Sequence, residues 1–171
     1  MITASVRTNT SSLISNGLGR ADRAARMAGG SAIAAMKAEA SRRIRERKAM
    51  KVATVNKALT TIYPSSGGLL VWILRASSQP MPVAAFNYRQ TSQGVSVEIN
   101  RGQRSLIRGA FVATMKSGHT GVFYRTSRAR LPIDEAYTTR VSDAFADATP
   151  YIERRGVEVF TATMTRLLAA R

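Results

Sequence analysis

The chain has 171 residues, no cysteine and one histidine, His119. This composition excludes disulfides, zinc–thiolate sites, iron–sulfur clusters and thiol nucleophiles, and any catalytic triad would depend on a single imidazole. Lys and Arg outnumber Asp and Glu by 26 to 10, and the resulting net charge of +16 predicts an anionic partner or setting.

The charge is unevenly distributed along the chain. The segments 1–57 and 58–130 carry 21 of the basic residues, whereas 131–171 has slightly more acidic than basic residues. This polarity is typical of a protein that faces a polyanion with one side and other proteins with another side. No apolar stretch approaches ~20 residues and the N-terminus lacks an apolar core, so we expect a protein kept or assembled in the cytosol.

The first part of the chain predicts helices. Residues 1–16 are polar with weak periodicity and predict a flexible arm, which leaves 17–171 as a single domain. The stretch from Arg20 to Lys48 is rich in strong helix formers. Gly29-Gly30 interrupts it and favours two helices, with Ser31 as the N-cap of the second. A short helix is expected over 52–59.

The middle of the chain predicts strands. Residues 69–75 are apolar on both alternating faces, which is typical of a strand covered on both sides, by the chain's own helices or by a neighbouring subunit. Strands are also expected over 83–89 and 95–100, and the latter alternates cleanly between apolar and polar residues. Residues 110–127 predict a hairpin with a glycine-containing loop.

The last part of the chain predicts two helices. The first covers 138–148, and the second begins at Thr149, with Pro150 in its first turn. Apolar residues of the second helix fall on one face, namely Val157, Phe160, Met164, Leu167 and Leu168. The expected fold is therefore α+β: an antiparallel sheet of about four to five strands with N-terminal and C-terminal helices packed on it.

Basic clusters are the features most suited to binding. The sharpest lies near the end of the first helical region and comprises Arg42, Arg43, Arg45, Arg47, Lys48 and Lys51. Because these cations surround the helix, they favour contact with phosphates or the lining of a DNA channel, and the alternative is a solvated helix end. Two further clusters are Arg101, Arg104 and Arg108, and Arg125, Arg128 and Arg130, which suit phosphates or acidic patches of a neighbouring subunit.

The sequence contains no convincing active site. We interpret His119, in a loop flanked by glycines, as a polar surface residue, and Asp134-Glu135 as charge at a helix start. No glycine-rich phosphate loop is present. We therefore expect no catalytic, cofactor or metal site and no small-molecule substrate.

The segment 108–145 carries a resemblance to a known family. It contains a Gly-Ala-Phe strand (109–111), a Lys/Gly turn (116–121), an aromatic strand with Arg125, a basic loop and Leu-Pro-Ile (131–133) before a helical segment. In this order the pattern resembles the minor tail protein Z family of tailed bacteriophages, a group of tail-completion proteins.

The resemblance implies a structural virion protein that forms a ring, typically of six subunits. Such a ring caps the tail tube, meets the head–tail connector or stopper protein and lets double-stranded genomic DNA pass. It implies a place in the neck of the virion after assembly in the host cytoplasm. The apolar strand then suggests subunit contacts through Leu70, Trp72 and Leu74, and the basic loop adds Arg125, Arg128 and Arg130. The alternatives are a basic, non-specific nucleic-acid-binding protein and, least favoured, an enzyme such as a nuclease.

Overall fold

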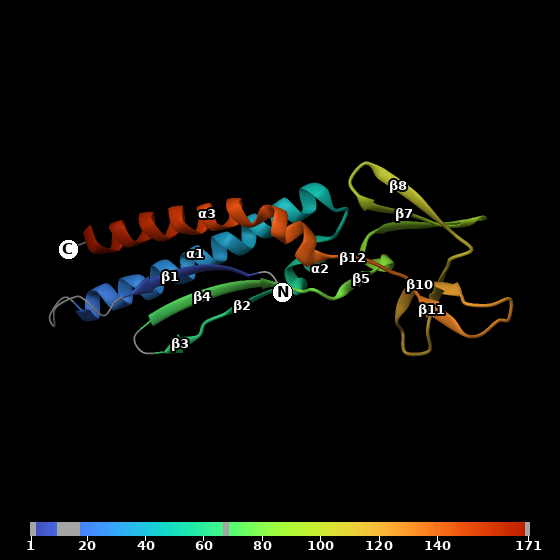
Figure 1. Cartoon of the computed structure of the whole chain (residues 1–171), viewed down its shortest axis with the longest axis horizontal. Helices are drawn as coiled ribbons and strands as arrows, with labels where there is room; N and C mark the ends of the chain where they lie inside the picture. The colour runs from blue at the N-terminus through green and yellow to red at the C-terminus, as the bar shows by residue number, and fades with distance from the viewer. Residues whose placement is uncertain (1–2, 10–17, 67–68, 170–171) are drawn as a thin grey trace.

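The computed structural model describes residues 3–9, 18–66 and 69–169 (Figure 1). In chain order the elements are β1 (Thr3–Asn9), α1 (Leu18–Arg47), α2 (Val52–Ala58), β2 (Leu59–Ile62), β3 (Ser65–Ser66), β4 (Leu69–Ala76), β5 (Pro80–Pro82), a 3-10 turn η1 (Val83–Ala85), β6 (Asn87–Thr91), β7 (Gly94–Asn100), β8 (Gln103–Arg108), β9 (Phe111–Thr114), β10 (Thr120–Arg125), β11 (Ile133–Glu135), β12 (Tyr137–Arg140) and α3 (Val141–Ala169). The α+β class with helices near both ends is confirmed.

The strands form four small antiparallel sheets. One contains β1, β4 and β2, with β3 also paired to β4; the others are β6-β7-β8, β9-β10-β11 and the pair β5-β12. A single sheet of four to five strands is therefore replaced by smaller pieces. The reason is that β4 pairs with β1 and β2, which precede it in the chain, and not with the strands that follow it.

The two long helices cover one face of the β1-β4-β2 sheet (Figure 1). Strand β4 turns Leu70, Trp72 and Leu74 into the core beneath them, where these side chains are 6%, 6% and 0% exposed. Val71 and Ile73 alternate with these residues and are half-buried, on the face turned away from the helices. The two-sided apolar pattern of β4 thus corresponds to one fully covered and one partly covered face.

Helix α1 is continuous, so the prediction of two helices divided at Gly29-Gly30 is wrong. Gly29 faces the sheet, and a Cβ atom at this position would lie 2.1 Å from Cζ2 of Trp72. The glycine therefore admits the indole ring against the helix backbone, and it does not end the helix. Gly30 points into open space, with no atom within 4 Å of its hypothetical Cβ.

Helix α3 is also continuous, although Pro150 lies inside it. The expected break at Thr149 does not occur, and the Thr149 hydroxyl instead donates a hydrogen bond to the Phe145 carbonyl at 3.0 Å. A proline removes one helical hydrogen bond and costs about 3 kcal/mol. Packing of α3 along α1, with Phe145 and Ile152 both fully buried, offsets this cost. Beyond Pro150 the predicted apolar face is only partly covered, and Val157 is 57% exposed.

Strands β6 to β11 lie at the end of the molecule away from the C-terminus (Figure 1). We call the sheets β6-β7-β8 and β9-β10-β11 the hairpin end. The alternation predicted for 95–100 is confirmed by β7, in which Val95 and Val97 are fully buried. The hairpin predicted over 110–127 is formed by β9 and β10, and its turn is closed by the hydrogen bond from Met115 N to His119 O, at 2.8 Å.

One buried core runs through both parts of the molecule, from Met36 and Leu74 under the helices to Val95 and Val122 at the hairpin end. Within the expected N-terminal arm (1–16), residues 3–9 form β1, whose backbone pairs with β4 in seven successive positions. The rest of that arm lies outside the described residues. The division into an arm and a single domain over 17–171 stays a prediction.

Candidate functional site

Two cations of the predicted DNA-channel cluster are neutralised by acids of their own helix. Arg42 donates hydrogen bonds to Glu39 Oε1 and Glu46 Oε1, both at 2.6 Å, and Arg43 Nε donates to Glu39 Oε1 at 2.8 Å. The hydrogen bond from Arg42 is the main cause of a lowered pKa at Glu39. These pairs are one turn apart, the spacing that brings side chains together on a helix.

The remaining cations of this cluster divide between pairing and exposure. Arg47 forms an ion pair with Asp147 of α3, and Lys48 Nζ donates to Asn100 Oδ1 at 2.9 Å. Arg45 Nε donates to the Ser41 carbonyl at 3.3 Å. Lys51 is exposed. Much of the cluster therefore joins α1 to itself, to α3 and to the β7–β8 turn.

Arg101, in the β7–β8 turn, closes the C-terminal end of α1. Its backbone N–H donates to the Arg47 carbonyl at 2.9 Å, and its Nε donates to the Arg45 carbonyl. The last carbonyls of a helix carry partial negative charge, and a cation placed there is stabilising. One residue of the second basic cluster thus has a structural role.

A second basic region forms a groove at the hairpin end. Arg108 ends β8, Arg125 ends β10, and Arg128 lies in the loop that follows. The groove has a volume of about 590 Å³, and we call it the arginine groove; it is lined by Ile107, Arg108, Gly109, Tyr124, Arg125, Ser127 and Arg128. Within the described ranges no carboxylate lines it, and none of its three arginines forms an ion pair.

The subunit-interface residues predicted on β4 lie mostly in the core. Leu70, Trp72 and Leu74 are at most 6% exposed and pack beneath the helices of their own chain, so they offer little surface to a neighbouring subunit. Periodicity reveals that such a strand has two apolar faces, but not which face the chain's own helices cover. The face turned away from the helices carries Val71 and Ile73. The predicted basic candidates Arg125, Arg128 and Arg130 are all exposed.

His119 belongs to a polar cluster that sequence reasoning did not find. Its Nε2 lies 2.9 Å from Glu135 Oε1, and the Tyr137 hydroxyl donates to Glu135 Oε2 at 3.0 Å. This second hydrogen bond raises the pKa of Tyr137. Glu135 lies in β11, so the interpretation of Asp134-Glu135 as a helix start is wrong. Among the described residues no group of three potential ligands could hold a metal ion.

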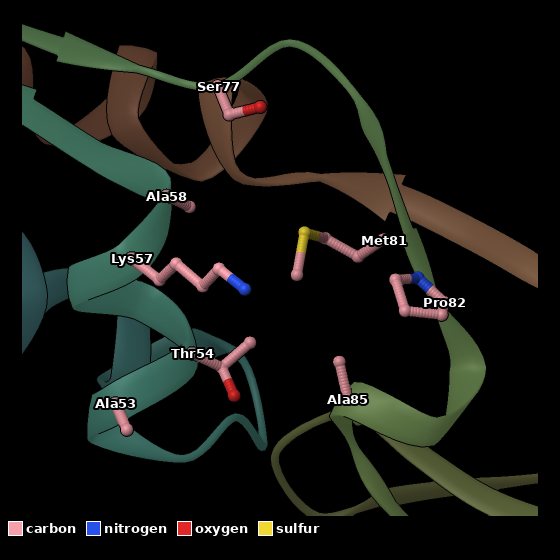
Figure 2. Close-up of a pocket in the computed structure, with 8 residues that line it drawn as sticks. All are labelled: Ala53, Thr54, Lys57, Ala58, Ser77, Met81, Pro82 and Ala85. Carbon is pink, nitrogen blue, oxygen red and sulfur yellow. The ribbon is translucent and has the colours of Figure 1, made fainter. Parts of the chain in front are cut away.

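An apolar groove of about 540 Å³ lies between α2 and β5 (Figure 2). Figure 2 shows the Lys57 amine and the Met81 thioether both pointing into it. The full lining comprises Ala53, Thr54, Lys57, Ala58, Ser77, Met81, Pro82 and Ala85. The lining brings one ammonium and the hydroxyls of Thr54 and Ser77 together with small apolar side chains, and no described hydrogen bond links Lys57 to either hydroxyl as in an activated nucleophile. The described lining residues include no carboxylate, imidazole or thiol of the kind that binds metal ions.

The helix-covered sheet and the small antiparallel sheets beside it define a protein of the α+β class, and its surface carries exposed arginines. The chain matches the model of the family described as prophage minor tail protein Z (GPZ) over residues 7–161, and it belongs to this family. It is thus a structural protein of the phage tail, and its place is the virion. No curated protein and no solved structure matches it significantly. No helix in the part of the chain that the structure describes is long and apolar enough to span a membrane.

Proposed function

We propose that this protein completes the phage tail as a ring of identical subunits at the head–tail junction. The ring, a hexamer in our proposal, caps the tail tube, docks to the head connector and lets double-stranded genomic DNA pass. Family membership over residues 7–161 is the observation that carries the proposal. The net charge of +16 supports it, because the inner wall of such a ring faces a polyanion.

A closed ring needs two different surfaces on each subunit, one for each neighbour. The outer face of β4 suits one of them, because Val71 and Ile73 are only half-buried there and Ile62 of β2 pairs with Ile73. No helix among the described elements covers this face (Figure 1). A second copy of the chain would complete its burial. Arg130, exposed in the β10–β11 loop, remains a candidate for the opposite surface.

The predicted DNA-channel cluster is reduced by its internal pairing. Arg42, Arg43 and Arg47 bind carboxylates of their own chain, which leaves Arg45 and Lys51 as the cations of this set best placed to meet DNA. An ion pair already made within the subunit must be broken or shared before its arginine can neutralise a phosphate. Other cations are therefore needed for most of the wall.

The proposal is tested by the mass of the purified protein and by particle assembly. We expect light scattering to give the mass of a closed ring, which is an integer multiple of the 18.5 kDa subunit mass. Ile73→Glu should reduce this mass to that of smaller species while the far-ultraviolet circular dichroism stays normal. Ser117→Glu, in the exposed β9–β10 turn, is the matched control and should leave assembly unchanged. The ring would be refuted by two results together: the purified protein stays monomeric at high concentration, and the phage still needs the protein to join its heads to its tails.

A further inference from the structure

We propose that the arginine groove is a binding site for the phosphate backbone of duplex DNA. The inference rests on the proposed function and deepens it, because it names the surface that meets the nucleic acid. It also moves the main DNA contact from the C-terminal end of α1 to the hairpin end of the molecule.

The groove carries positive charge that no described carboxylate compensates. Arg108, Arg125 and Arg128 converge on one open groove, although they come from β8, β10 and the following loop. Three like charges brought together without a carboxylate repel one another, and a bound anion relieves that repulsion. Arg42 differs from the three groove arginines, because it already has two carboxylate partners. The groove arginines have none in the described chain, so they are the ones able to bind an added anion.

Most acidic side chains of this chain already have partners, so the anion has another source. Six of the ten acidic side chains pair with arginines of the same chain, namely Asp22, Glu39, Glu46, Glu98, Asp147 and Glu158, and a seventh, Glu135, is held by His119. The other three are Asp134, Asp143 and Glu153, and they are spread over β11 and two turns of α3. A second copy therefore offers few carboxylates without a partner to match the groove, which favours an external polyanion.

The side chains that line the groove have the chemistry of a phosphate site. Guanidinium groups bind phosphate oxygens through paired N–H donors, and this makes arginine suited to phosphate recognition. The Arg125 guanidinium lies over the Phe111 ring, 5.2 Å from its centre, which orients the group while its edges stay accessible. Tyr124, 40% exposed, adds a hydroxyl donor of the kind that contacts phosphate or sugar.

The groove predicts binding without base recognition. Its polar groups are three arginines, a tyrosine and a serine on strand ends and a loop, and it presents no helix to the major groove of DNA. Contacts to phosphate fix position and carry no sequence information directly. Such binding suits a genome that must move past the protein in any sequence register.

The test compares two variants of equal charge change. One replaces Arg108, Arg125 and Arg128 by Gln; the control replaces Arg20, Arg23 and Arg166 by Gln, which are exposed helix arginines without an ion-pair partner in the described chain. Binding of the full-length protein to a fluorescent duplex is measured by anisotropy at several salt concentrations. Each phosphate contact contributes about 0.9 to the slope of log affinity against log salt.

We expect the groove variant to lower this slope by roughly 2 to 3 and the affinity at least tenfold, with a much smaller change in the control. Equal behaviour of the two variants would overturn the proposal. A groove variant that loses oligomeric mass but keeps the wild-type slope would also overturn it, because the groove would then be a subunit contact. A protein that is monomeric by light scattering but shows the expected slopes would refute the ring and support the groove.

Discussion

Replacing Gly29 by alanine should destabilise the protein, although alanine is the better helix former. The Cβ atom added at this position would lie 2.1 Å from Cζ2 and 2.2 Å from Cε2 of Trp72. Carbon atoms in favourable contact are about 3.5–4.0 Å apart, so the indole or the helix must retreat by roughly 1.5 Å. The neighbouring Gly30 offers a matched control, because its Cβ would meet nothing within 4 Å.

The two substitutions are expected to have opposite signs. Gly→Ala inside a helix gains about 1 kcal/mol in the free energy of unfolding, and Gly30→Ala should show this gain in full. At Gly29 the same gain is opposed by overpacking, which costs about 3 kcal/mol at the upper end of its usual range. The net loss is then about 2 kcal/mol, and the variants differ by about 3 kcal/mol. For a chain of this length the melting temperatures should differ by roughly 6–12 °C.

The free energy of unfolding is measured by urea unfolding. The transition is monitored by far-ultraviolet circular dichroism and by the fluorescence of Trp72, the only tryptophan in the chain. In a Trp72→Leu background the cost of Gly29→Ala should shrink, because the atoms that clash are removed. The reasoning is refuted if Gly29→Ala is as stable as Gly30→Ala, or if its cost is the same with leucine at position 72.

Three further predictions concern the polar contacts. Glu39→Gln should lower the free energy of unfolding by about 0.5–1 kcal/mol at neutral pH. Because the pKa of Glu39 is lowered in the folded protein, this difference from wild type, measured by urea unfolding, should vanish as the pH falls through that pKa. Gly121→Ala should lower the melting temperature, since its Cβ would lie 2.9 Å from Cζ of the buried Phe123 ring, besides 2.8 Å from Glu135 Oε1, and an unchanged melting temperature would contradict this. Tyr137→Phe should remove from an ultraviolet titration one phenol that ionises above its usual range, because the hydrogen bond to Glu135 raises the pKa of Tyr137. A titration curve in which that high-pH component persists would refute the assignment.

Local patterns predicted the elements better than their connections. The apolar–polar alternation around Val95 and Val97 identifies β7, and the Ala- and Arg-rich composition identifies α1. The predicted helix break at Gly29 was wrong because the role of this glycine depends on its contact with Trp72, a residue distant in the chain. Strand β1 was also missed, since its polar segment is held by backbone pairing with β4, which leaves no periodic apolar signal.

The candidate site shows the same division. A run of cations at Arg42–Lys48 is visible in the sequence, but its pairing with Asp147 depends on how α3 packs on α1. The arginine groove assembles Arg108, Arg125 and Arg128 from separate segments, so no spacing rule marks it. The sequence indicates the arginine groove only through composition: between residues 101 and 130 the chain has seven basic and no acidic residues.

An averaged electron cryomicroscopy map of joined heads and tails would test the central claim most directly. The account predicts a closed ring of this protein at the junction, with the hairpin end and the arginine groove turned toward the density of the DNA. A map in which the groove faces outward, away from the nucleic acid, or in which the protein is found elsewhere on the tail, would contradict it.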